Sequence, residues 1–276
     1  MTSGVSIIST LSATLGSVRI PIYQVDAFAS RLFTGNPAAV CPLEAWPDAS
    51  LMQAIAAENN LAETAFFVPR GGAYELRWFT PGVEVDLCGH ATLAAAVVIL
   101  NYLDKQAEEV RFETRSGELR VRRAGELLAM DFPSRPPVRC AEVPELTAAL
   151  GAPPLELWES RDYMALYESE EQILALRPDM GRLAAVGHSA AIVTASGREA
   201  DFVSRFFAPA SGVPEEPATG SSHSTLFPYW AGRLGKTKLR ALQLSSRGGE
   251  LMCEDRGDRV TIAGRGIAYL EGTITV

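Results

Sequence analysis

The stretch that decides the fold is Asp86-Leu87-Cys88-Gly89-His90-Ala91-Thr92, which leads into a long apolar run. A second stretch of the same design, Glu215-Glu216-Pro217-Ala218-Thr219-Gly220-Ser221, precedes another segment of helical length. In both, turn-forming residues lead into a glycine and a small polar side chain, the pattern of a helix N-terminus with free backbone N–H groups. Two such ends facing each other would form an anion site flanked by His90, Glu216 and Ser221.

Strands and turns surround both predicted helices. The run from His90 to Leu103 is apolar on every side, which predicts a helix wrapped by the rest of the fold. Apolar segments separated by Gly-containing turns precede and follow it, so each half of the chain is expected to be a largely antiparallel sheet around one buried helix. The class is α+β. The Pro-rich segment 133–137 predicts a boundary between domains of residues 18–133 and 134–265, with strand 266–276 a candidate addition to the first.

Composition excludes several classes of protein. The chain has 276 residues, 47% of them hydrophobic, and a net charge of -8 with scattered Lys and Arg, so we expect no nucleic-acid partner. No Lys or Arg precedes Arg19, so a secretory signal is not expected, and residues 1–17 are interpreted as an extension or an edge strand. The apolar run 91–103 would be about 20 Å long as a helix, too short for a bilayer core of about 30 Å.

The spacing of the cysteines and histidines predicts neither disulfide bonds nor a metal site. The four cysteines lack CxxC spacing, which favours free thiols in a reducing cytoplasm. The three histidines lack zinc-site spacing, so we predict no metal. The glycine motifs of nucleotide sites are absent, so no cofactor is expected. We further expect a homodimer.

Glu63 and His90 are the candidate proton-transfer residues. Glu63 heads an apolar strand, where burial would raise its pKa toward the range of a general acid or base. The alternative is a strand-edge carboxylate in water. His90 would donate to a substrate oxygen or move a proton, and the alternative is a helix-terminal histidine bonded to a nearby loop.

The second stretch supplies candidate binding groups. Glu216 would orient the polar group of a substrate or, alternatively, complement the helix dipole. Ser221 is a ligand group or a simple N-cap. Gly89, Thr219 and Gly220 would present backbone N–H groups to the substrate.

Together these residues lie in blocks that resemble the phenazine-biosynthesis PhzF-like isomerases. The blocks run in order from about residue 20 to the C-terminus and carry a strong signal. They are Asp26-Ala27-Phe28, Gly35-Asn36-Pro37-Ala38-Ala39-Val40, Asn60-Leu61-Ala62-Glu63-Thr64, Phe79-Thr80-Pro81 with Glu84 to Thr92, Gly212 to Ser221, and Arg247-Gly248-Gly249.

The resemblance implies the diaminopimelate epimerase-like fold, with two similar domains, each a curved sheet around a central helix, and an active site between them. It places the catalytic glutamate at Glu63, the active-site histidine at His90 and the serine at Ser221. The family's aspartate falls on Glu216, where this chain departs by one methylene. Related epimerases use two cysteines. Here Cys88 has no partner, so two-base inversion is disfavoured and Cys88 is interpreted as a small buried hydrophobe.

The leading hypothesis is a cofactor-free isomerase in which Glu63 moves a proton on a small carboxylate substrate. Two alternatives stay open. One is a non-catalytic protein that binds a small carboxylate in the same cleft. The other is a hydrolase using Ser189, because Gly187-His188-Ser189-Ala190-Ala191 partly matches a nucleophile elbow but lacks its final glycine.

Overall fold

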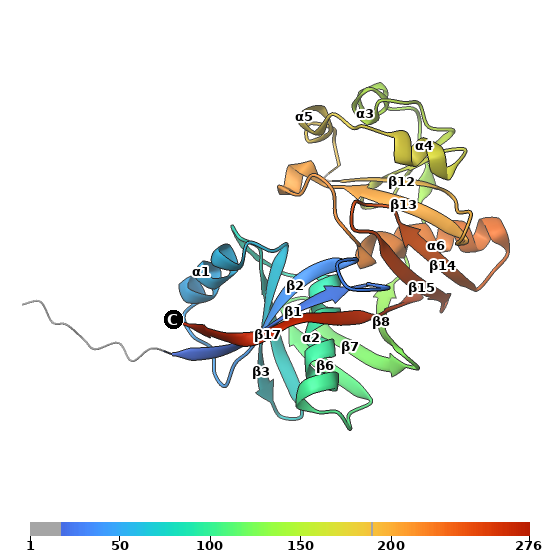
Figure 1. Cartoon of the computed structure of the whole chain (residues 1–276). Coiled ribbons are helices and arrows are strands. Elements are labelled where there is room, and N and C mark those ends of the chain that lie inside the picture. The colour runs from blue at the N-terminus through green and yellow to red at the C-terminus, as the bar shows by residue number, and fades with distance from the viewer. Residues whose placement is uncertain (1–17, 189) are drawn as a thin grey trace, which may run out of the picture.

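The computed structural model describes residues 18–188 and 190–276, whose strands pair in one continuous sheet (Figure 1). Residues 1–17, the expected extension or edge strand, and Ser189, the hydrolase candidate, lie outside the described residues. Pairing starts at β17 (Gly266–Thr275), which lies beside β1 (Arg19–Ala27). It crosses between the halves where β8 (Leu127–Pro133) pairs with β16 (Arg259–Gly264).

The remaining elements fall on either side of this crossing. The N-terminal half contains β2 (Asn36–Pro42), α1 (Ala49–Asn59), β3 (Glu63–Arg70), β4 (Ala73–Phe79), β5 (Glu84–Val85), α2 (Gly89–Val98), the π-helix η1 (Ile99–Leu103), β6 (Glu109–Thr114) and β7 (Gly117–Ala124). The C-terminal half contains β9 (Val138–Arg139), α3 (Pro144–Leu150), β10 (Glu156–Glu159), β11 (Tyr163–Leu166), α4 (Glu170–Ala175), α5 (Met180–Leu183), β12 (Ala191–Ser196), β13 (Phe202–Phe207), the 3₁₀-helix η2 (Pro209–Ser211), α6 (Gly220–Leu234), β14 (Lys238–Gln243) and β15 (Gly249–Asp255).

The two halves repeat the same order of strand pairings. From β1 to β8, β2–β3 and β4–β6 are the parallel steps and the other steps are antiparallel. From β10 to β16, the parallel steps β11–β12 and β13–β14 fall at the same places in the order. Parallel neighbours need a crossover, and helices occupy all four crossovers. This confirms the predicted fold of two similar, mostly antiparallel sheets, each around a central helix, while the domain boundary at residue 133 stays a prediction.

The helix α2 fills the N-terminal half. Its residues from His90 to Val98 are all buried, and it contacts β1, β2, β3, β8 and β17. A run of alanines at 94–96 lets these strands approach closely. The predicted helix 90–103 is correct in extent, but its last turn is π-helical and residues 101–103 are exposed. Within the described residues, no helix is both long and apolar enough to cross a bilayer.

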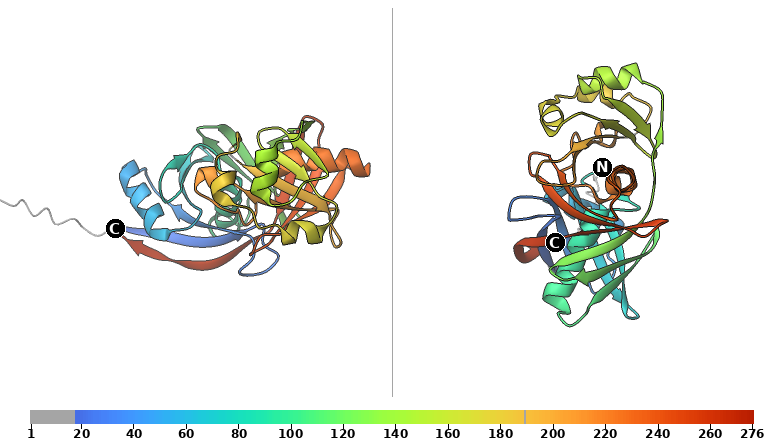
Figure 2. Two further views of the ribbon diagram at one scale, coloured as in Figure 1. Left: turned by 90° about the horizontal axis from the view of Figure 1, so that it is seen from above. Right: turned by 90° about the vertical axis from the view of Figure 1, so that its right-hand side faces the viewer.

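The C-terminal half has a second core on the outer face of its sheet. Leu150 of α3, Ile173 of α4 and Leu183 of α5 pack there with Phe207 of β13. These short helices, yellow-green to yellow in Figure 2, cover the end of the molecule remote from β17. Apolar side chains cover both faces of β12 and β13. The helix α6 packs on the face opposite the short helices, where Trp230 stacks on Phe202.

The first turns of α6 contain a buried histidine. His223 is fully buried, and its Nδ1 lies 2.8 Å from the carbonyl oxygen of Thr219. Because a carbonyl only accepts, Nδ1 carries the proton. The other ring nitrogen, Nε2, is buried without a hydrogen-bond partner among the described residues. Burial therefore lowers the pKa of His223 to about 4, against a smaller opposing effect of the hydrogen bond to Thr219.

We expect this histidine to make stability fall in mild acid. Below the ordinary pKa of 6.5 the unfolded chain takes up a proton that the folded chain refuses until about pH 4. Over that window His223 should cost about 3 kcal/mol of unfolding free energy. His223→Phe should remove this part of the pH dependence, and Ser222 still donates to the Thr219 carbonyl in the variant. Urea unfolding at pH 7 and pH 4.5 measures the free energy of unfolding at each pH. An equal loss of this free energy in wild type and variant would contradict the expectation.

Candidate active site

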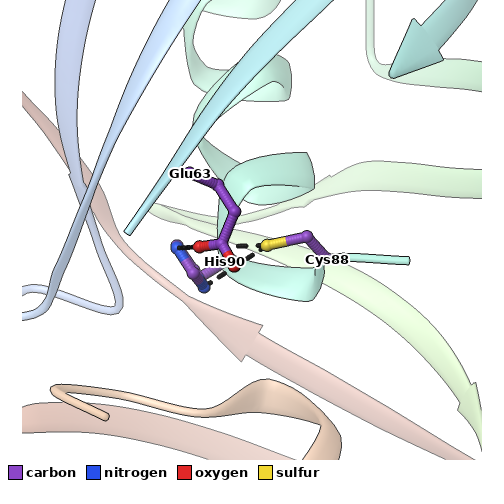
Figure 3. A group of neighbouring side chains, drawn as sticks. All are labelled: Glu63, Cys88 and His90. Carbon is purple, nitrogen blue, oxygen red and sulfur yellow. Dashed lines mark hydrogen bonds and ion pairs between the residues drawn. The ribbon is translucent and has the colours of Figure 1, made fainter. Parts of the chain in front are cut away.

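The candidate site begins where β3 and α2 start beside each other. Glu63 is the first residue of β3, Cys88 is the N-cap of α2, and His90 is the second residue of that helix. Their side chains point toward one another (Figure 3). His90 Nε2 lies 2.9 Å from Glu63 Oε2, and Cys88 Sγ lies 3.5 Å from His90 Nδ1. Sequence segments 25 residues apart thus form a carboxylate–imidazole–thiol cluster.

The charge state of Glu63 differs from the expectation. Burial alone would raise its pKa, but the charge and hydrogen bonding of His90, with a further hydrogen bond from Cys88, outweigh burial and lower the pKa. The predicted raised pKa is therefore wrong, because the sequence did not reveal which partners face this carboxylate. Burial also opposes the charged form of His90, yet Cys88 and Glu63 together raise the pKa of His90 well above its ordinary value.

Cys88 is not only a packing residue. Burial, with the nearby charge of Glu63, raises the pKa of its thiol to about 11. Its burial agrees with the sequence-based interpretation, and the structure adds its contacts with Glu63 and His90. All four cysteines, Cys41, Cys88, Cys140 and Cys253, are free.

Asn36, at the start of β2, joins the two halves of the chain. It is fully buried, and its amide nitrogen donates to Glu216 Oε2 at 2.7 Å and to the Ala218 carbonyl at 3.0 Å. The same nitrogen lies 3.2 Å from His90 Nδ1. Burial and the charge of Glu63 raise the pKa of Glu216, against the effects of His90 and Asn36. The structure therefore brings together Glu63, His90 and Glu216, and adds Asn36 as the residue between them.

Ser221 and Thr219 have different places from those expected. The N-cap of α6 is Thr219 rather than Ser221, and Ser221 is a partly exposed residue of the first turn. Among the described residues Ser221 makes no hydrogen bond to the cluster, although it occupies the same position in α6 as His90 in α2. The N–H of Thr219 donates to Gln243 Oε1 at 2.8 Å, so it is already satisfied within the protein. Gln243 is a buried positioning residue that no sequence signal indicated.

The two helix N-termini meet on one aromatic ring. A Cβ at Gly89 would lie 3.2 Å from the ring of Phe132, and one at Gly220 would lie 3.3 Å from Phe28 and 3.8 Å from Phe132. Both predicted helix starts are thus confirmed, and both glycines are sites of close approach. The two helix starts therefore lie close to each other, while the anion site expected between them stays a prediction.

An ion pair between a buried aspartate and a partly exposed arginine holds the loop that carries Asn36. Arg247 Nη2 lies 2.7 Å from Asp26 Oδ1, and its Nε donates to the Gly35 carbonyl at 2.9 Å. The N–H of Gly35 donates to the Gly248 carbonyl at 2.6 Å. These residues come from opposite ends of the chain. Their presence in the motif blocks was the only sequence signal for them.

The paired sheets, the central helices and the buried cluster between the halves define a protein of the diaminopimelate epimerase-like fold. The family model described as phenazine biosynthesis-like protein matches residues 25–272. The chain is 54% identical over 257 residues to a Pseudomonas aeruginosa protein named an uncharacterized isomerase, covering 93% of this chain and 99% of that one. It is 39% identical to the human phenazine biosynthesis-like domain-containing protein, covering 94% and 100% of the two chains.

Solved structures agree with the sequence matches. A PhzF family crystal structure from Enterococcus faecalis superposes with a TM-score of 0.92 at 46% identity, covering 94% of this chain and all of that one. A hydroxyproline epimerase from Agrobacterium vitis shares the fold, with a TM-score of 0.58 at 11% identity over 94% and 93% of the two chains. The chain belongs to the phenazine biosynthesis-like protein family.

The loop that places Asn36 should tolerate no side chain at Gly35. Its φ is +73°, and a Cβ there would lie 2.3 Å from the Ala27 carbonyl oxygen. Gly71 also has a positive φ, +56°, but a Cβ there would meet nothing within 4 Å. We expect Gly71→Ala to cost about 1 kcal/mol, the cost of backbone strain alone, and Gly35→Ala at least about 2 kcal/mol more. Urea unfolding measures both, and equal effects would contradict the steric argument.

Proposed function

We propose that the protein is a cofactor-independent isomerase that moves a proton on a small carboxylate substrate, with Glu63 as the general base and acid. The single observation that carries this proposal is the state of Glu63. Its carboxylate is buried, Oε2 lies 2.9 Å from His90 Nε2, and its pKa is lowered. An ionised, largely desolvated carboxylate has more lone pairs than this one partner uses, so it can accept a proton as a base.

The reaction needs one bond to break and one to form at Glu63. The Glu63 carboxylate takes a proton from a carbon next to, or conjugated with, the substrate carboxylate, and the electron pair of the broken C–H bond moves into the conjugated system. His90 and the N-termini of α2 and α6 supply positive groups that stabilise the charge developing on the substrate carboxylate. Glu63 then returns the proton to another carbon on the same face. Relatives named isomerases support the class of reaction.

The position of Cys88 supports a single base. Cys88 and Glu63 contact each other in one cluster, so they approach a bound substrate from the same side (Figure 3). Stereoinversion by two bases needs them on opposite faces of the reacting carbon. Glu216, held by Asn36, is the proposed orienting group, with Ser221, Gly89 and Gly220 contacting the substrate when it binds. The N–H of Thr219 already donates to Gln243. We also propose a cytoplasmic homodimer.

The test is isotope exchange. Purified protein is incubated in deuterium oxide with a panel of small diene, cyclic and aromatic carboxylates, and deuterium uptake and double-bond shifts are followed by NMR. Glu63→Gln should lower exchange by about 10²- to 10⁴-fold while ligand binding persists, because only the proton acceptor is lost. The control Glu58→Gln changes an exposed carboxylate of α1 and should leave exchange unchanged.

Two outcomes would count against the proposal. Undiminished exchange in Glu63→Gln would remove Glu63 from the role of base. Tight binding of a carboxylate with no exchange in wild type or variant would favour the non-catalytic binding protein.

Activity should persist into mild acid, because the pKa of Glu63 is lowered mainly by His90, against burial. His90→Asn removes that effect and leaves burial to raise the pKa of Glu63. The acid limb of its normalised pH–rate profile should therefore move to higher pH. His188→Asn, in a loop where the ring lies 3.0 Å from the Arg161 carbonyl, is the control. An acid limb that stays in place in His90→Asn would show that Glu63 does not control it.

A further inference from the structure

Three side chains of the candidate site also form a set of metal donors. One oxygen of Glu63, the sulfur of Cys88 and one ring nitrogen of His90 all lie within 4.8 Å of one another. Thiolate, imidazole and carboxylate together suit zinc-like cations, whereas magnesium and calcium prefer oxygen alone. The cluster was missed in the sequence because its spacing, 63, 88 and 90, matches no zinc motif.

The distances fit one face of a tetrahedral site. Metal–ligand lengths of about 2.3 Å to sulfur and about 2.0 Å to nitrogen and oxygen place tetrahedral donors roughly 3.3 to 3.6 Å apart. His90 Nε2 lies 2.9 Å from Glu63 Oε2 and 4.0 Å from Cys88 Sγ. These two separations differ from the tetrahedral values by about half an ångström, and the third pair, Glu63 oxygen and Cys88 sulfur, lies within 4.8 Å. The fourth position would be left for water or a ligand oxygen.

The bound form would carry no uncompensated charge. A divalent cation held by the Glu63 carboxylate, the Cys88 thiolate and a neutral His90 imidazole would form a site with a net charge of zero. Burial therefore would not penalise the bound form. Metal ligands must be deprotonated, so the proton of the Cys88 thiol leaves when the cation binds.

We propose that Glu63, Cys88 and His90 bind one zinc-like divalent cation, which would occupy the base and stop proton transfer. Binding of the cation stands on the geometry of the cluster alone, whereas its inhibitory effect rests on the proposed function. The bound cation would then be a reversible inhibitor of the enzyme rather than a cofactor. Glu63, with 12% of its side chain exposed, is the most accessible of the three donors.

Cobalt(II) is the probe, because cobalt bound to thiolate gives a charge-transfer band in the near ultraviolet. Reduced, tag-free, full-length protein is titrated with Co²⁺ and then with Zn²⁺. We expect one cobalt per chain, displacement by zinc, and the same band in the control Cys140→Ser, which removes a partly exposed thiol elsewhere. Cys88→Ser should abolish the band. Glu63→Gln and His90→Asn should each weaken binding by about 100-fold or more, since even outer-shell partners cost about 10- to 100-fold.

Calorimetry of Zn²⁺ binding in buffers of different ionisation enthalpy counts the protons, and we expect a release of at least one per zinc, the proton of the Cys88 thiol. Absence of the band in wild type, its persistence in folded Cys88→Ser and Cys88→Ala, or release of no proton would each overturn the site. The two proposals can fail independently. If wild type binds metal but Glu63→Gln exchanges deuterium as fast as wild type, only the role of Glu63 in proton transfer is overturned. If Glu63→Gln loses exchange but wild type binds no metal, only the cation site is overturned.

Discussion

The close approach of two helix N-termini is the constraint on which the site depends. α2 and α6 belong to different halves of the chain, and both start against the ring of Phe132. A Cβ at Gly89 would lie 3.2 Å from the ring of Phe132 and one at Gly220 would lie 3.3 Å from that of Phe28, so a side chain at either position would require the rings to shift. Phe28 completes the junction in a left-handed backbone conformation, φ 57°, which bulky residues rarely adopt. The strain is held by the surrounding sheets.

This junction determines the electrostatics of the cluster. Each group alone would be shifted toward its neutral form by burial, and Glu216 follows that rule. Glu63 and His90 depart from it because they face each other at 2.9 Å and Cys88 interacts with both. The result is a pair of carboxylates with opposite shifts on the two sides of Asn36, one lowered and one raised. Two carboxylates whose environments separate their pKa values are suited to different roles in acid–base chemistry.

Local sequence signals predicted the elements, and long-range contacts defined the site. The Gly-His and Gly-Ser pairs marked both helix starts because a helix N-terminus has a composition of its own. The lowered pKa of Glu63 could not be predicted, since it depends on a histidine 27 positions away. The bridge from Asn36 to Glu216 spans 180 positions, and Gln243 lies in an ordinary strand. Periodicity records which face of an element is buried, but it does not record which polar groups meet in the interior.

The most direct test of a single base at Glu63 follows the proton itself. A substrate found by exchange is labelled with deuterium at the carbon that loses its proton, and is turned over once in ordinary water. The account predicts that part of the label appears at the new carbon, on one face, and that it does so equally in Cys88→Ala, because a largely buried carboxylate exchanges slowly with solvent. Complete loss of the deuterium to solvent would contradict it.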